Sequence, residues 1–271
     1  MTAERTIAVS ARTVIDGCLG SRGTANLDTV YDVGVALGLA EQTVRLAIRR
    51  MQHAGDLVQI GRGRAGRIER TGTAARAARG ESDLVEFAFA GDAPGASWDG
   101  AWRVYAFSIP EEARAERDAL RTALVWLGAA PVVSGMYVSP HALDTALDDA
   151  TPPGLLERWL VRSTTSDLQL PGTTSPAEIA ERLWPAATTI AAYEPLALLL
   201  NDVRGPAPST VIAATARALE LAEGLDRALT VDPLLPSELR PPAWAPARLR
   251  RLFLNEWNEL ERRFPELPVF A

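Results

Sequence analysis

Apolar side chains recur at helical spacing through the first fifty residues of the chain. They predict a helix within 6–20, a second helix over 27–37 and a third over 41–54. Gly55 follows the third segment, and glycine commonly ends a helix because it tolerates a left-handed backbone conformation. The intervening residues 38–40 are expected to form a tight turn.

A short hairpin is predicted directly after the third helix. Residues 57–60 and 68–70 read as strands, and the tip between them, 61–67, holds three glycines and three arginines. Helix, helix, turn, helix and hairpin, in that order, are the layout of a winged helix-turn-helix. Residues 1–72 are therefore expected to form a winged helix-turn-helix DNA-binding domain.

Strand and helix signals alternate in the middle of the chain. A linker is expected over 73–97, with a helix that runs into a strand and a closing loop rich in small residues. A strand at 102–109, a helix at 111–127 and a second strand in 131–138 follow. This β-α-β order predicts an α/β or ferredoxin-like domain over 98–172, used for dimerisation or regulation.

The rest of the chain is mostly helical in pattern. A short helix over 141–147 and a further strand within 158–168 complete the central region. Four later helices, separated by proline-rich loops, are predicted at 177–183, 188–202, 210–229 and 246–264. Residues 173–271 are thus expected to form a C-terminal helical domain, a candidate for ligand response. The expected fold class is α+β.

The distribution of charge changes this picture. The formal net charge is −6, which by itself argues against a nucleic-acid partner. Residues 1–80, however, hold 12 Arg against 7 Asp or Glu, whereas the remaining residues hold 16 Arg against 27 acids. A basic segment on an acidic body fits a DNA-reading head on a regulatory body, although an uneven spread of charge also arises by chance.

Other bulk features narrow the class of protein. No apolar run approaches the roughly 18 residues of a membrane span, and residues 1–10 lack the shape of a signal peptide. Cys18 is the single cysteine, so an internal disulfide and a cysteine zinc site are excluded. We therefore expect a cytoplasmic protein with no membrane partner, no metal and no cofactor.

The third helix carries the strongest local signal for DNA binding. Its inward positions are Val44, Ile48 and Met51, and its outward face is polar. In a helix-turn-helix this helix lies in the major groove, where Gln pairs with adenine and Arg with guanine. The outward candidates are Glu41, Gln42, Thr43, Arg45, Arg49 and Arg50. The alternative is an ordinary amphipathic helix with a solvated face.

The hairpin tip adds three more candidates, Arg62, Arg64 and Arg67. Arginines on such a wing can enter the minor groove or hold phosphates, and glycines let the backbone approach a groove closely. A plain solvated hairpin is the alternative for the tip taken alone. A recognition-type helix followed directly by this tip favours DNA binding.

Signals for catalysis are weak, and no enzyme is expected. The two histidines, His53 and His141, read as surface or capping residues. No Ser/His/Asp, Walker or dinucleotide pattern appears. The glycines of the tip do fit G-x-G-x-x-G, but they lie between two strands and do not open a helix.

Three segments of the chain resemble the PaaX family of transcriptional repressors. They are LGLAEQTVRLAIRRM in the head, the central run from WDGAWRVYAFSIP to SGMYVSP (98–140), and VDPLLPSELRPPAW (231–244). The resemblance implies a winged head, a central ferredoxin-like domain and a C-terminal helical domain. It also implies a homodimer on palindromic double-stranded DNA, released by an effector such as phenylacetyl-coenzyme A or another acyl or aromatic metabolite. Pro185 departs from the acid usual in the family after Leu-Trp.

The central region is also similar to the small ferredoxin-like subunit of the CRISPR spacer-integration machinery. Some members of that group are metal-dependent nucleases with an aspartate at the end of the first strand. Ser108 stands at the matching position here. A neutral hydroxyl is a poor substitute for a carboxylate on Mg²⁺, so a nuclease is the less favoured alternative.

An acyl-coenzyme A effector requires arginines that meet its anionic groups. The candidates in the central region are Arg103, Arg114, Arg117 and Arg121, with solvated helix-face arginines as the alternative reading. A DNA-binding regulator that acts without a small ligand, through a protein partner, fits the sequence equally well.

Overall fold

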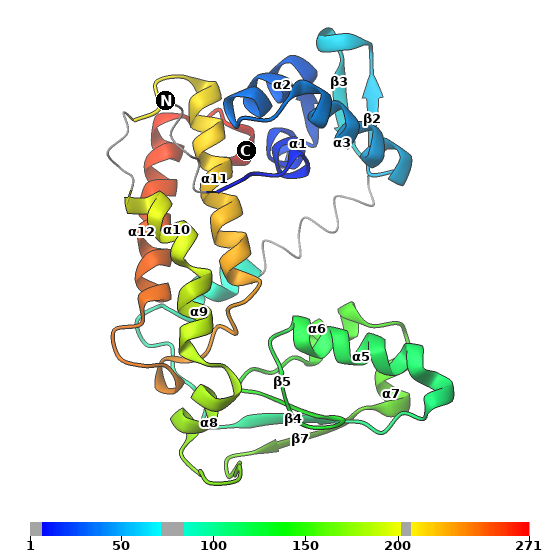
Figure 1. The fold of residues 1–271 in the computed structure, drawn as a ribbon, viewed down its shortest axis with the longest axis vertical. Helices are drawn as coiled ribbons and strands as arrows, with labels where there is room; N and C mark the ends of the chain where they lie inside the picture. The colour runs from blue at the N-terminus through cyan, green and yellow to red at the C-terminus, as the bar shows by residue number, and fades with distance from the viewer. Residues whose placement is uncertain (1–6, 72–83, 202–206, 271) are drawn as a thin grey trace. The chain divides into compact units, whose positions relative to one another are not determined.

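The computed structural model describes residues 7–71, 84–201 and 207–270, and it mixes helices with two small sheets, as the α+β expectation requires (Figure 1). The chain divides into two compact units. The first comprises residues 1–86, 193–227 and 246–271, and the second comprises 87–192 and 228–245. In the described part of the chain, no helix is both long and apolar enough to cross a membrane.

The first unit opens with the helices predicted from the sequence. They are α1 (Ala11–Leu19), α2 (Leu27–Ala36) and α3 (Glu41–Ala54). Helix α1 begins after the start of the apolar pattern, because Ser10 is its N-cap. The side chain of Ser10 accepts a hydrogen bond from the Thr13 backbone amide at 3.0 Å. Helix α3 ends at Gly55, whose φ of 79° is left-handed as expected.

The predicted hairpin is present, with one strand added. The hairpin strands are β2 (Leu57–Ile60) and β3 (Arg67–Arg70), and the 3₁₀ turn η1 (Gly63–Ala65) lies at the tip. The added strand β1 (Thr24–Asn26) pairs with β3, which gives the sheet order β1-β3-β2. Three residues are too few to show an alternating pattern, so the sequence does not predict β1.

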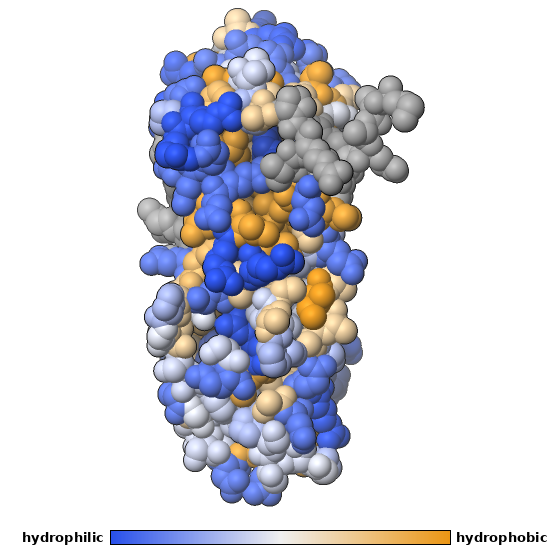
Figure 2. Space-filling view, turned by 90° about the vertical axis from the view of Figure 1, so that its left-hand side faces the viewer, coloured by the Kyte–Doolittle hydropathy of each residue, from blue (hydrophilic) through white to orange (hydrophobic). Residues whose placement is uncertain are grey.

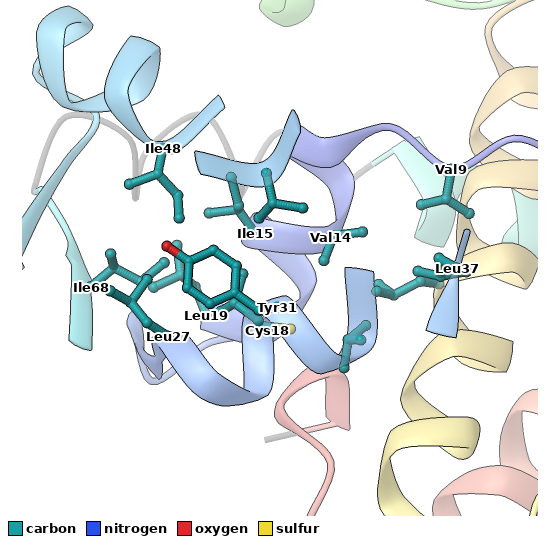
Figure 3. Packing of buried hydrophobic residues seen from close by; sticks show 14 of the residues in the cluster. Val9, Val14, Ile15, Cys18, Leu19, Leu27, Tyr31, Leu37, Ile48 and Ile68 are labelled. Carbon is teal, nitrogen blue, oxygen red and sulfur yellow. The ribbon is translucent and has the colours of Figure 1, made fainter. Parts of the chain in front are cut away.

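The core of this unit joins the N-terminal helices to the C-terminal part of the chain. Val14 and Ile15 of α1, with Ile48 and Ile68, are fully buried (Figure 3). Helix α11 (Val211–Leu229) adds buried side chains to the same core. The unit is completed by α10 (Glu194–Asn201), α12 (Ala245–Arg263) and η4 (Pro268–Phe270).

These units differ from the division expected from the sequence into 1–72, 73–97, 98–172 and 173–271. Helix α11 packs on α1 so closely that a Cβ at Gly17 would lie 2.2 Å from Cδ2 of Leu219. Thr13 Oγ1 also donates to Glu223 Oε2 at 2.6 Å. Apolar and polar contacts therefore place part of the predicted C-terminal domain with the head.

The second unit is built on a four-stranded sheet of order β5-β6-β4-β7, with all neighbours antiparallel. The strands are β4 (Trp102–Ala106), β5 (Ala130–Val133), β6 (Met136–Ser139) and β7 (Val161–Thr165). The prediction of a single strand within 131–138 is wrong. The segment forms a hairpin, because Gly135 (φ 75°) reverses the chain and its carbonyl accepts from the Phe107 amide at 2.8 Å.

Helices cover both faces of this sheet. Tyr105 and Tyr137 belong to a buried cluster with the helices η2 (Glu111–Ala113), α5 (Arg114–Trp126), α6 (Asp144–Ala150) and α7 (Leu155–Trp159). Trp102 and Val138 belong to a second cluster with α8 (Pro176–Leu183) and η3 (Ser237–Leu239). Alternation of side chains along β4 and β6 thus supplies one core on each face.

Two further helices differ from the sequence expectation. The helix predicted over 188–202 is two helices, α9 (Ala186–Ala192) and α10, which belong to different units. Most of the linker helix expected before residue 90 lies outside the described residues, and 84–90 are helical.

Hydrophobic side chains gather on part of the surface shown in Figure 2, which views the side where α10 and α12 lie in Figure 1. Exposed residues of these helices include Leu198, Leu252 and Leu254. Scattered exposed leucines are normal on protein surfaces. They do not by themselves mark a binding site.

Candidate nucleic-acid interface

Helix α3 separates its side chains as the sequence predicted. Val44, Ile48 and Met51 are buried in the core of the first unit, whereas Gln42, Thr43, Arg45, Arg49 and Arg50 are exposed. Glu41 is partly exposed. Within the described residues, no hydrogen bond or ion pair engages the side chains of Arg49 and Arg50. Two guanidinium groups on the outer face of α3 are thus available to an external acceptor.

The hairpin tip is fixed at its base and exposed at its end. Gly66 is buried, and its carbonyl accepts a hydrogen bond from the Leu27 amide at the start of α2 at 2.9 Å. Arg62 and Arg67 are exposed, and Nε of Arg67 pairs with Glu69 of its own strand at 2.9 Å. The tip therefore has an anchored backbone and presents arginine side chains.

A cluster of charged side chains joins the tip to α2 and α3. Arg64 Nη1 lies 3.1 Å from Glu41 Oε2, and Arg64 Nη2 bonds Oδ1 of Asp32 on α2. The other oxygen of Glu41 accepts from Arg45 Nη2 at 2.5 Å. We call Tyr31, Asp32, Glu41, Arg45 and Arg64 the arginine cluster.

The ring of Tyr31 completes the arginine cluster. The guanidinium carbons of Arg45 and Arg64 each lie over this ring, 5.6 Å from its centroid. Hydrogen bonds that the arginines donate to the acids raise the pKa of both arginines, with Glu41 the main cause for Arg45 and Asp32 for Arg64. Both guanidinium groups therefore stay charged.

The structure thus sorts the nine predicted DNA-contacting residues into groups. It brings Glu41, Arg45 and Arg64 together, and it ties Arg67 to Glu69. The remaining five are exposed, and they are Gln42, Thr43, Arg49, Arg50 and Arg62. Sequence reasoning missed Tyr31 and Asp32, because their partner Arg64 is more than 30 residues away along the chain.

The four arginines proposed for an effector lie on two elements, β4 and α5. Arg103 of β4 forms a double hydrogen bond with Asp99, 2.8 Å at Nη1, and also donates to the Ala101 carbonyl. This pair lowers the pKa of Asp99 to about 2. The other three lie on α5, where Arg114 and Arg117 pair with Glu111. Arg121 is exposed on the same helix.

The two histidines occupy different surroundings. His53 is exposed near the end of α3, while His141 is half-buried, with Nε2 3.0 Å from the Leu234 carbonyl and its ring edge-to-face with Phe87. Burial lowers the pKa of His141, so its neutral form is favoured. The ring of His141 therefore takes part in the packing of the second unit, which the predicted surface or capping role did not include.

Ser108 is exposed just beyond the end of β4, in the position expected from the sequence. Among the residues that the structure describes, no three His, Cys, Asp or Glu side chains gather as metal ligands would. Cys18 is buried in the core of the first unit, and burial raises its pKa to about 12.

Comparison with known proteins bears on the fold and the family. Residues 95–169 match the family described as "PaaX protein central Cas2-like domain". A solved structure, an uncharacterized protein designated Rv0674 from Mycobacterium tuberculosis, is 23% identical and aligns over 95% of this chain and 98% of that chain, with a TM-score of 0.58. That likeness shows the fold alone. No curated protein matches the chain significantly.

The matched residues coincide with one part of the second unit. They run from the loop before β4 to the residues after β7, and so include the whole four-stranded sheet with α5, α6 and α7. The resemblance recognised in the central segment of the sequence is thereby confirmed, and residues 95–169 match the central Cas2-like domain of the PaaX family.

Proposed function

We propose that this protein is a DNA-binding transcriptional repressor of the PaaX type. The observation that carries the proposal is the exposed arginine-bearing face of α3 next to an arginine-bearing hairpin tip, in a chain with a PaaX central domain. Nothing in the geometry of the described residues favours catalysis over binding.

In this proposal, residues 11–70 act as a winged helix-turn-helix. Helix α3 enters the major groove, where Gln42, Thr43 and Arg45 face base edges. Arg49, Arg50 and Arg62 hold phosphates, which adds affinity without sequence information. Support comes from the order of α2, α3 and the hairpin, and from the exposure of these side chains.

The second unit would serve as the dimerisation and regulatory part. Support comes from its strand order and antiparallel neighbours, which a split β-α-β, ferredoxin-like sheet would have. A homodimer would place two α3 helices in successive major grooves of palindromic DNA, one helical turn apart. The resemblance to PaaX repressors supports this arrangement.

Release from DNA would follow binding of an acyl-coenzyme A or aromatic metabolite. By linkage, such an effector lowers DNA affinity by the factor by which DNA lowers effector affinity. Arg103, Arg114, Arg117 and Arg121 remain the proposed anionic contacts. Acyl-coenzyme A esters screened by thermal shift should include one that stabilises the protein, by about 2.7 kcal/mol at 100 times its Kd.

The deciding experiment is a mobility-shift titration against the promoter of the protein's own gene, with random DNA as competitor, at two salt concentrations. We expect retention that survives the competitor and weakens with salt. Arg50→Ala should reduce it, whereas Arg251→Ala removes an exposed arginine of α12 and should leave it unchanged. Equal effects of both variants would contradict the proposed interface.

A further inference from the structure

The arginine cluster links three elements of the head through alternating charges. Arg64 divides its two terminal nitrogens between Asp32 of α2 and Glu41 of α3, and Glu41 divides its two oxygens between Arg64 and Arg45. The order along the cluster is therefore arginine, acid, arginine, acid. The hairpin tip is held to both helices by side chains at its exposed end.

The ring of Tyr31 is the rigidly held part of the arginine cluster. Its side chain is only 4% exposed and lies among Leu27, Ile48 and Ile68 in the core (Figure 3). Because the ring cannot move without disturbing the core, the two guanidinium groups above it share a fixed platform. The cluster is thus preorganised by the fold of the head.

We propose that Asp32 and Tyr31 are positioning residues that raise the discrimination of the head between operator and random DNA. The inference rests on the proposed DNA-binding function. The carboxylates of Asp32 and Glu41 hold Arg64 and Arg45 in the free protein. Neither arginine is then free to pair with the first phosphate it meets.

DNA phosphates compete with the carboxylates of the cluster for its two arginines. A carboxylate and a phosphate are alternative partners for the same guanidinium fork. The cluster contains two arginines and two acids, so its formal charge is zero. On random DNA only the electrostatic attraction to phosphates can offset the loss of the carboxylate pairs. On an operator, contacts to base edges supply the affinity while Arg64 stays paired with Asp32, so Asp32 weakens random binding more than operator binding.

The cluster contributes little to the stability of the fold. The side chains of Asp32 and Arg64 are 52% and 44% exposed, and ion pairs at such positions stabilise proteins only weakly. A variant that breaks the pair should therefore fold normally. Its effect on DNA binding can then be read without a loss of native protein.

The test compares Asp32→Asn with Asp28→Asn. Both variants remove one exposed carboxylate from α2, but Asp28 accepts its hydrogen bonds from its neighbour Thr29 and lies outside the arginine cluster. We expect Asp32→Asn to bind random DNA roughly five-fold more tightly, with a salt slope steeper by about 0.9 for one added phosphate contact. The ratio of operator to random affinity should fall. Asp28→Asn should leave that ratio unchanged.

A double variant shows whether the effect passes through Arg64. In an Arg64→Gln background, Asp32→Asn should add nothing to random-DNA affinity, because the arginine it releases is absent. An undiminished gain in that background would overturn the proposal. So would equal behaviour of Asp32→Asn and Asp28→Asn.

A measurement without DNA separates this inference from the proposed function. Hydrogen exchange of the backbone amides of 62–66 reports how firmly the tip is held in the free protein. Asp32→Asn should speed this exchange several-fold, and Asp28→Asn should not. Unchanged exchange in Asp32→Asn would overturn the inference whether or not the protein binds DNA. Absence of DNA binding by the wild type, with the exchange effect present, would instead overturn the DNA-binding function.

Discussion

Nη1 of Arg64, at the hairpin tip, lies 3.1 Å from Oε2 of Glu41, the first residue of α3. The two residues are 23 positions apart and were predicted as separate DNA contacts. Their pairing gives Glu41 a different role, since both of its oxygens are engaged by arginines of the same protein. The tip and the helix that would enter the groove are therefore coupled before any DNA is present.

Arg45 is expected to read a base. Arg45→Ala should lower operator affinity roughly ten-fold or more, because the contact to one base is lost. It should weaken random-DNA binding far less. Titration against operators with single base-pair substitutions checks this, because the variant should lose discrimination at one position only. An equal loss on operator and random DNA would assign Arg45 to phosphate.

Gly17 tests the packing of α1 on α11. Gly17→Ala should lower the free energy of unfolding by about 1–3 kcal/mol, because the new methyl overlaps Leu219. In a Leu219→Ala background the same substitution should cost little, or gain up to about 1 kcal/mol from helix propensity. Chemical denaturation of the wild type, the two single variants and the double variant completes this double-mutant cycle. An identical cost in both backgrounds would contradict the contact.

The pair of Asp92 and Arg240 is the most buried ion pair in the described part of the second unit. Their side chains are 8% and 7% exposed and their charged atoms are 2.8 Å apart. Asp92→Ala should cost about 3–5 kcal/mol, since it leaves a buried guanidinium without its carboxylate. A double Asp92→Leu/Arg240→Met variant should be more stable than Asp92→Ala.

An exposed pair provides the control for that comparison. Nη2 of Arg162 lies 3.8 Å from Oδ1 of Asp148, and the two side chains are 41% and 60% exposed. Asp148→Ala should change the free energy of unfolding by less than about 1 kcal/mol. Similar costs for Asp92→Ala and Asp148→Ala, measured by urea denaturation, would contradict the role of burial.

His141 should make the second unit sensitive to acid. Burial lowers its pKa in the folded state, so below its ordinary value of 6.5 the unfolded chain binds more protons than the folded one. Stability is therefore complete above that value and is lost as the pH falls through it. Arg103 also disfavours the charged form, whereas Asp232 and the carbonyls of Pro233 and Leu234 oppose the shift.

Denaturation between about pH 7.5 and about pH 5.5 checks this, roughly one unit on either side of the ordinary value. His141→Gln should flatten the fall in stability over this range. His53→Gln replaces the exposed histidine of α3 and should leave the pH dependence as it is. A slope that persists in His141→Gln would assign it to other groups.

The local elements of the head were predictable from the sequence. Helical spacing of Val44, Ile48 and Met51 fixes which face of α3 is buried, and a glycine at position 55 ends the helix. The glycines and arginines of 61–67 likewise indicated a hairpin tip. Such features depend on neighbours a few residues apart, so the sequence carries them directly.

The same holds for the recognition of the central domain. The run from Trp98 to Pro140 identified a PaaX-type segment, and residues 95–169 match that family's central domain. The pattern was less informative where a turn is short. A reversal at Gly135 split one expected strand into two, and β1 was too short to be seen.

The sequence by itself determined the order of α1, α2, α3 and the hairpin, the buried face of α3, the basic charge of the head and the PaaX resemblance of the central domain. Only the tertiary structure decided which distant residues meet. It placed α11 against α1 and His141 against the Leu234 carbonyl, and it gathered Tyr31, Asp32, Glu41, Arg45 and Arg64 into one cluster. Periodicity reports contacts within one element, whereas these contacts join segments whose separation along the chain leaves no periodic trace.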